Sequence, residues 1–280
     1  MEKLFRFRHL LVAATLGLSL AACEKDKDAD PNANPAESEA DFKAASQAVM
    51  ATDKAAFDAF AQSSITDGAF SKDLITGCAT VDISPLIPWN QFPKTITIDF
   101  GTEQDCQDPD GQYRKGKIIT VLSALPRSLD ASKTTTFQGY AVGEIGLEGS
   151  VQSTFGLNEQ EQAEYVLKVV DFLISTPSGN FEHGSDRVAT WVEGDDTPFQ
   201  PWDDAYSLTG TATGSHPNGI RYATTIQTPL LYKVECQEYV SGSMLVTLSD
   251  GRSFTVDFGD GACDGSATLS SGAWSTELEF

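Results

Sequence analysis

The sequence predicts a mainly β protein: an antiparallel β-sandwich or barrel-like domain with a duplicated hairpin module, plus one N-terminal helix. Three observations predict this fold. Short runs of alternating apolar and polar residues recur along the chain. Gly, Asp-Gly or Asn-Gly turns separate these runs, and one unit with two cysteines occurs twice. We expect the β ectodomain to span residues 65–280.

Residues 1–22 have the pattern of a bacterial lipoprotein signal peptide. Basic residues precede an apolar run from Leu10 to Leu20, which is too short for a spanning helix of ~20 residues. The following Leu20-Ala21-Ala22-Cys23 resembles the lipoprotein box, in which the cysteine carries fatty acyl chains such as palmitate after cleavage before it. Cys23 is therefore the expected lipid carrier, and the alternative is an ordinary signal peptide followed by a free cysteine. Two or more acyl chains suffice for stable anchoring.

Residues 23–36 predict an acidic, flexible tether, because the segment is polar and lacks apolar anchors. The acids beside Cys23 resemble the signal that sends lipoproteins of Bacteroidetes-type bacteria to the outer face of the outer membrane. We therefore expect lipid anchoring at the cell surface. An acidic spacer facing the periplasm is the alternative.

Residues 37–64 predict the N-terminal helix. Ser38 and Asp41 form a near capping box, and apolar residues recur at helical spacing through residue 62. This apolar stripe is expected to dock on the β domain or to pack against a partner.

The duplicated module carries an Asp-Phe-Gly run between two cysteines. In each copy, residues 78–124 and 236–280, the Asp lies 21 residues after the first cysteine and the second follows the Gly within five. The corresponding residues are Cys78, Asp99-Phe100-Gly101 and Cys106 in the first copy, and Cys236, Asp257-Phe258-Gly259 and Cys263 in the second. Alternation before each Gly predicts a half-buried strand. Asp-Phe-Gly also occurs in protein kinases, but the other kinase motifs are missing.

Four cysteines remain after Cys23, and an even number in an exported protein predicts disulfides. Three pairings are possible. The repeated spacing favours Cys78–Cys106 and Cys236–Cys263, one within each module. A Cys₄ metal site is the alternative, but it requires close cysteine pairs, and the sequence has none.

The rest of the chain predicts further strands. The run Tyr165–Ile174 fits a helix or a strand, and its β-branched content favours a strand. Turns at Asn218–Gly219 and Asp250–Gly251 predict two hairpins. Glycines at 139, 143, 146 and 149 are candidate bulges. The expected strands cover residues 117–122, 134–142, 144–155, 165–174, 186–193, 208–213, 221–226, 244–248, 253–258 and 274–280.

The chain is strongly acidic, with a formal net charge of −21. Removal of residues 1–22 takes away three basic residues and one acid, which leaves 16 basic and 39 acidic side chains, or −23. Nucleic acid and anionic bilayers need a basic footprint, so neither is an expected partner. The membrane contact is therefore expected through the lipid anchor alone.

Several of these motifs occur together in a known group. Phe92–Gly101, Arg114–Ile118, Arg187–Trp191, Leu208–Ala212 and Asp257–Asp264, with the four cysteines, resemble cell-surface lipoproteins of Bacteroidetes-type bacteria. The likeness runs from about Cys78 to the end of the chain. It implies anchoring, β architecture and disulfides, and it implies no activity.

The sequence offers no catalytic motif. His183 and His216 lie far apart without ligand spacing or an adjacent nucleophile, and both are expected in loops. Two carboxylates could act as the catalytic pair of a glycosidase. The 39 acids after residue 22 form too many possible pairs for the sequence to select one. No catalytic residue is therefore assigned, and a non-enzymatic role is favoured.

Two stretches are candidates for ligand binding. The first joins aromatic rings, which stack on sugars, to carboxylates that accept hydroxyl protons. It comprises Trp191, Glu193, Asp195, Asp196, Phe199, Trp202, Asp203 and Asp204. The alternative is that Trp191 belongs to the core, Trp202 caps its edge and the acids are solvated.

The second stretch is a set of acids around glycine turns that could ligate Ca²⁺. It comprises Asp257, Asp260 and Asp264, with Asp105, Asp108 and Asp110 in the first copy. Turn formation by Asp is the simpler explanation. Beyond Ca²⁺, no cofactor is expected.

Together these features predict a lipid-anchored envelope protein with a non-catalytic binding or structural role, whose ligand is a glycan or a partner protein. A carbohydrate-active or other hydrolytic enzyme is the alternative.

Overall fold

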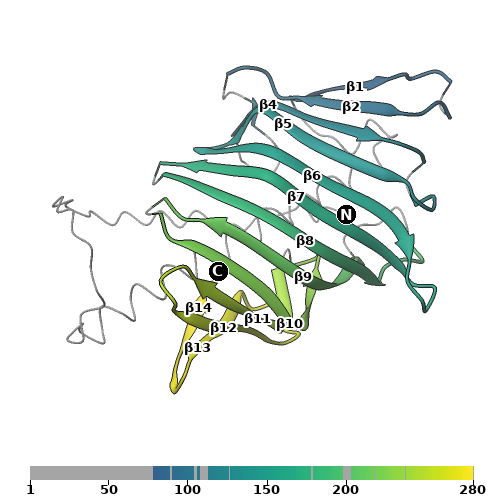
Figure 1. Cartoon of the computed structure of the whole chain (residues 1–280). Helices are drawn as coiled ribbons and strands as arrows, with labels where there is room; N and C mark the ends of the chain where they lie inside the picture. The colour runs from purple at the N-terminus through teal and green to yellow at the C-terminus, as the bar shows by residue number, and fades with distance from the viewer. Residues whose placement is uncertain are drawn as a thin grey trace, which may run out of the picture.

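The computed structural model describes residues 78–279 except 89, 104–105, 108–112, 126, 178, 198–202, 218 and 237. The predicted signal peptide, Cys23, the tether and the helix in 37–64 lie outside the described residues. The described part of the chain forms fourteen strands (Figure 1): β1 (Thr80–Ser84), β2 (Lys94–Asp99), β3 (Cys106–Gln107), β4 (Tyr113–Leu122), β5 (Ser132–Val142), β6 (Ile145–Leu157), β7 (Ala163–Thr176), β8 (Gly179–Glu193), β9 (Ala205–Ser215), β10 (Arg221–Lys233), β11 (Glu238–Leu248), β12 (Ser253–Asp260), β13 (Ser266–Ser271) and β14 (Trp274–Glu279).

The strands make one antiparallel sheet. Pairing follows chain order from β1 to β14, and the two-residue β3 pairs with β4 beside the main path. The predicted mainly β, antiparallel class is therefore confirmed. A sandwich or a closed barrel is not confirmed, because the strands of the main path pair in chain order and, among the described residues, β1 and β14 are the two ends of that path. Among those residues no helix reaches the length and hydropathy needed to cross a membrane.

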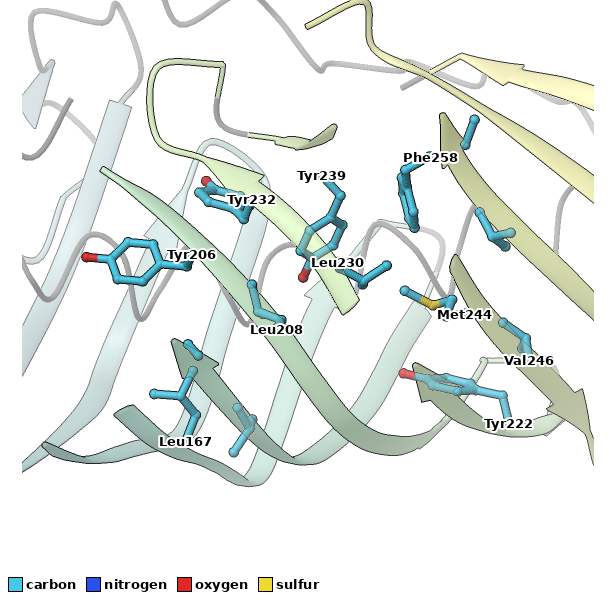
Figure 2. Packing of buried hydrophobic residues seen from close by; sticks show 14 of the residues in the cluster. Leu167, Tyr206, Leu208, Tyr222, Leu230, Tyr232, Tyr239, Met244, Val246 and Phe258 are labelled. Atoms are coloured by element: carbon cyan, nitrogen blue, oxygen red, sulfur yellow. The ribbon is translucent and has the colours of Figure 1, made fainter. Parts of the chain in front are cut away.

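The main core lies on one face of the strands from β6 to β14. Leu208, Leu230, Met244, Val246 and Leu278 are fully buried in it. Figure 1 shows that β10–β14 bend away from the plane of β4–β9, and Figure 2 shows side chains from both parts pointing into a shared interior. Fourteen strands rarely stay flat, because each pair adds right-handed twist. This curl lets a single sheet bury its own apolar face.

The two predicted copies of the module share several local contacts. The strands β1–β2–β4 and β11–β12–β13 form two three-stranded meanders around the Asp-Phe-Gly runs. Asp99 accepts a hydrogen bond from the N–H of Gly101 at 2.9 Å, and Asp257 accepts one from Gly259 at 2.9 Å. The disulfides Cys78–Cys106 and Cys236–Cys263 both form, as the spacing predicted.

The polar contact of the module's Asp differs between the two copies. Lys117 lies opposite Asp99 on β4, and its Nζ is 2.7 Å from the carboxylate. Thr268 occupies the matching position opposite Asp257 on β13. The hydrogen bond from Lys117 lowers the pKa of Asp99. The half-exposed ion pair therefore belongs to the first copy alone.

Every strand expected from the alternating pattern is present. The segment that fitted a helix or a strand, Tyr165–Ile174, lies within β7, and both predicted hairpins form, β9–β10 and β11–β12. The pattern missed β1, β3 and β13, which are short. Short strands carry few alternating residues, so their signal is weak.

Register shifts mark the bulges, and glycine makes two of them possible by close approach. Gly116 has φ +77°, and a Cβ there would lie 2.2 Å from the carbonyl oxygen of Gly139. Gly149 has φ +103° and packs in the same way against the carbonyl of Asp171. Bulges at Gly139 and Gly149 agree with the sequence, whereas Gly143 lies in a turn and Gly146 keeps regular register.

Candidate functional site

The predicted aromatic and acidic stretch divides between the core and the surface. Trp191 ends the buried face of β8, and Asp204 immediately precedes β9; both are buried. Glu193, Asp195, Asp196 and Asp203 are exposed. Phe199 and Trp202 lie outside the described residues. Of the residues described, the structure thus brings together Trp191 and Asp204.

Two residues contact the Trp191 ring. Tyr206, opposite Trp191 on β9, stacks on it with centroids 5.9 Å apart. The guanidinium carbon of Arg127, from the β4–β5 loop, lies 4.1 Å from the ring centroid. A guanidinium over an indole face is a favourable cation–π contact. The ring is only 4% exposed, so it is not accessible for stacking on a sugar.

Asp204 is a buried carboxylate beside that ring. It is 5% exposed, and its Oδ2 accepts a hydrogen bond from the Tyr206 hydroxyl at 3.1 Å. Among the described residues neither Asp204 Oδ1 nor Trp191 Nε1 has a hydrogen-bond partner. We call Arg127, Trp191, Asp204 and Tyr206 the Asp204 cluster.

Burial controls the protonation of this cluster. Loss of solvent raises the pKa of Asp204 to about 6, while the hydrogen bond from Tyr206 and the charge of Arg127 oppose that rise. The indole N–H of Trp191 lowers it least, since its geometry falls short of a hydrogen bond. Burial, together with the charge of Asp204, raises the pKa of Tyr206 well above its usual value. Perturbed pKa values occur in active sites and in structural networks alike. The stacking and burial here describe a structural network.

Among the described residues, Asp257, Asp260 and Asp264 do not form a group with metal-ligand spacing. The Oδ1 of Asp257 accepts from the Gly259 N–H, and the Oδ1 of Asp264 accepts from both the N–H and the hydroxyl of Ser266. Asp260 pairs with Ser241 at the end of β12. Turn formation therefore accounts for two of these three carboxylates, and Asp105, Asp108 and Asp110 lie outside the described residues.

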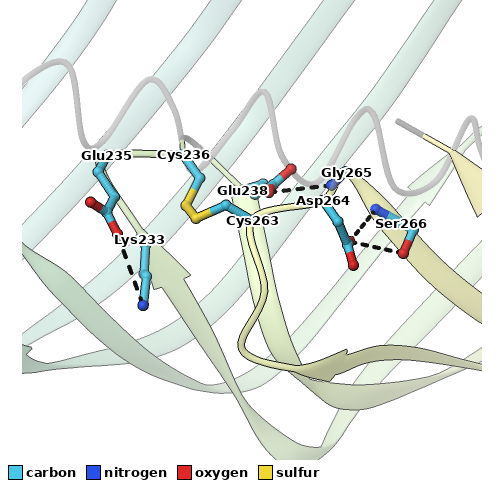
Figure 3. The surroundings of a disulfide bond; sticks show 8 residues. All are labelled: Lys233, Glu235, Cys236, Glu238, Cys263, Asp264, Gly265 and Ser266. Carbon is cyan, nitrogen blue, oxygen red and sulfur yellow. Dashed lines mark hydrogen bonds and ion pairs between the residues drawn. A yellow bond between two sulfur atoms is a disulfide. The ribbon is translucent and has the colours of Figure 1, made fainter.

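In the described part of the chain, one group of three side chains has metal-ligand spacing: Glu235, Cys236 and Cys263. Figure 3 shows the two sulfur atoms bonded to each other and Glu235 turned toward Lys233, whose Nζ is 3.9 Å away. Disulfide sulfurs are not thiolates, and only a thiolate is a strong metal ligand. The group is thus a disulfide with a neighbouring acid.

One histidine departs from expectation. His216 lies in the β9–β10 loop, as predicted, and its ring packs against Phe181. His183 was expected in a loop and is instead buried on β8, where its Nδ1 is 2.8 Å from the Tyr222 hydroxyl. Gly214 lies between them on β9, and a Cβ there would meet the Tyr222 hydroxyl at 2.3 Å. The glycine is what lets the two rings meet.

Exposed apolar side chains gather at one end of the strands. The relevant end is where β1, β4, β6 and β8 finish, on the right of Figure 1. Of the ten exposed large hydrophobic residues described, eight lie at or near this end and two, Tyr113 and Ile145, at the other. The eight are Leu86, Ile87, Val121, Leu125, Leu129, Leu157, Val166 and Val192. Sequence reasoning did not find this surface, because it depends on which loops the topology brings together.

No protein-family model, no curated protein and no solved structure matches this chain.

Proposed function

We propose that this chain is a lipid-anchored protein of the bacterial outer membrane, exposed at the cell surface, with a non-catalytic binding role. The sequence supports the anchor through the signal-like segment 1–22, Cys23 and the acidic tether. Two disulfides in the β-sheet suit an oxidising compartment outside the cytoplasm. In this proposal residues 37–64 form an amphipathic helix between tether and sheet.

One observation carries the binding role: the one-sided gathering of exposed apolar side chains at the loop end of the sheet. Scattered surface hydrophobics are normal, whereas a gathered and exposed set marks an interaction site. A protein is the favoured ligand. The glycan hypothesis relied on aromatic faces, and the face of Trp191 is occupied by Arg127.

The anchor is tested by Cys23→Ser in a Bacteroidetes-type host. The wild-type chain should fractionate with the outer membrane and react with a membrane-impermeant label, whereas Cys23→Ser should leave the membrane fraction. Replacing Glu24, Asp26 and Asp28 by their amides should preserve acylation but abolish labelling from outside. Acylated protein found in the Cys23→Ser strain, or a wild-type chain released without detergent, would overturn the anchor.

A further inference from the structure

The loop end of the sheet displays its apolar residues at high exposure. Ile87 is 83% exposed, Leu129 64% and Leu86 62%. Leu157, at the end of β6, is 49% exposed. These residues belong to the β1–β2 and β4–β5 loops and to neighbouring strand ends, so they lie along consecutive strands about 5 Å apart. They form a row that we call the apolar rim.

The β1–β2 part of this rim is held by a buried lysine. Lys94 is 0% exposed, and its Nζ donates to the carbonyl of Pro85 at 2.5 Å and to that of Pro88 at 3.4 Å. These two carbonyls flank Leu86 and Ile87. Burying an ammonium group is costly unless it is hydrogen-bonded. The two carbonyl groups satisfy the Lys94 ammonium, and the lysine in turn fixes the β1–β2 loop. The two side chains are thereby held outward.

The β4–β5 part is held by backbone hydrogen bonds. The N–H of Asp130 donates to the carbonyl of Phe155 at 3.1 Å, and the N–H of Phe155 donates to Ala131 at 2.9 Å. These bonds fix the loop on the end of β6, next to Leu157. Arg127 ties the same loop to Trp191. An apolar surface that is already ordered loses little conformational entropy on binding.

The charge around the rim is negative. Exposed acids in these loops and strand ends are Asp130, Glu159, Glu161, Glu193, Asp195 and Asp196. The described cations near this end are buried or paired with an acid or a ring. Lys94 and Lys133 are buried, and Arg127 lies on Trp191. Lys168 pairs with Asp186, and Lys233 pairs with Glu235. Acids beside an apolar rim disfavour an anionic bilayer and a second copy of this acidic chain. They favour a cationic occupant.

We propose that the apolar rim and its acids dock a protein segment that presents apolar side chains flanked by Lys or Arg. This inference rests on the proposed binding role and specifies its partner. The apolar side chains of the partner contact Leu86, Ile87 and Leu129, and its cations face Asp195, Asp196 and their neighbours. Association is fastest at low salt, since complementary charges steer the encounter.

The probe is a fluorescent peptide of alternating Leu and Lys, titrated by anisotropy into the full chain purified in non-ionic detergent. Controls are a Leu-Ser peptide of equal length and vesicles of zwitterionic or anionic lipid. We expect the Leu-Lys peptide to bind at least tenfold more tightly than the Leu-Ser peptide at low salt. Combined Ile87→Ser and Leu129→Ser should weaken binding about tenfold, and combined Asp195→Asn and Asp196→Asn about fivefold.

Matched changes at the opposite end separate this site from general attraction to an acidic protein. Ile145→Ser and Glu144→Gln lie at that end, are exposed, and should leave the affinity within twofold. Equal losses from both ends would overturn the site, as would preference for vesicles or equal affinity for the two peptides. These titrations do not depend on Cys23. Absence of peptide binding would therefore not contradict lipid anchoring, and absence of lipid anchoring would not contradict peptide binding at the apolar rim.

Discussion

The hydroxyl of Tyr206 donates to one carboxylate oxygen of Asp204 at 3.1 Å, while no described residue donates to the other oxygen. The carboxylate is thus half satisfied inside the protein, next to the ring of Trp191. A buried charge with one hydrogen bond is expensive, because the lost hydration is only partly replaced. The protonated form avoids most of that cost.

Stability should therefore depend on pH through Asp204. Its pKa rises from 3.8 to about 6 on folding, so the folded state binds a proton that the unfolded state has released. The stabilisation is fully present below pH 4 and is lost as the pH rises through about 6. The free energy of unfolding should fall by ~3 kcal/mol between those two pH values. Urea titrations from pH 4 to pH 8 measure it.

Asp204→Asn removes the titrating group and keeps an acceptor for Tyr206. At pH 7 this variant should be more stable than the wild type by ~1–3 kcal/mol, and the difference should vanish near pH 4. Asp196→Asn changes an exposed acid in the same loop and is the control. An unchanged pH profile in Asp204→Asn would show that the carboxylate is solvated.

Tyr206→Phe should act in the opposite direction. It removes the donor to Asp204 Oδ2 and leaves a buried carboxylate without that bond. The expected loss is ~2 kcal/mol at pH 7, since hydrogen bonds to charged groups are strong. In the Asp204→Asn background the loss should fall to ~1 kcal/mol. A double-mutant cycle measures the difference, and additive effects would argue against the bond.

The two disulfides should contribute similar amounts. Their cysteines are 28 and 27 residues apart, so each bond restricts the unfolded chain by about 3–4 kcal/mol in the chain-entropy model. Replacing Cys78 and Cys106 together by Ala should cost slightly more than replacing Cys236 and Cys263. Cys106 is buried against Phe100 and Tyr140, so its loss also leaves a cavity. Denaturant midpoints of the two double variants test the order, and a larger loss from the second pair would contradict it.

Gly242→Ala should be among the most damaging small changes. Gly242 has φ +93°, and a Cβ would lie 2.2 Å from the carbonyl oxygen of Pro229 on β10. We expect a loss of ~3 kcal/mol or more, from backbone strain and overlap together. Gly272 has φ +61° with open space around it, so Gly272→Ala should cost only ~1–2 kcal/mol. Thermal melts of the two variants measure these losses. Equal losses of stability would mean that β10 and β11 can move apart at Gly242 at little cost.

Local patterns predicted the strands and the pairing of cysteines. Alternation in Ile96–Phe100 and in Ser253–Phe258 reflects only the two-residue period of a strand. The first segment lies in β2 except for Phe100, which follows it, and the second lies within β12. The matched spacing of the cysteines fixed the disulfides for the same reason: it is a local property of one repeated unit. These features could be predicted correctly because they do not depend on contacts between distant parts of the chain.

Features that depend on distant contacts were not predicted. Nothing in the sequence places Arg127 over Trp191, since the contact joins a loop after β4 to the end of β8. His183 was misplaced because its partner, Tyr222, lies 39 residues away across Gly214. The alternating pattern likewise could not distinguish two packed sheets from one curled sheet, because both bury one face of every strand.

The unbroken chain-order pairing has a consequence for how such proteins can vary. Between its two end strands, each strand on the main path is paired with its predecessor and its successor. A whole hairpin such as β7–β8 could therefore be removed, and β6 could meet β9 with direction preserved. The two cysteine modules lie toward the two ends of that path and would be untouched. Related chains should therefore differ in length by pairs of strands between two constant ends.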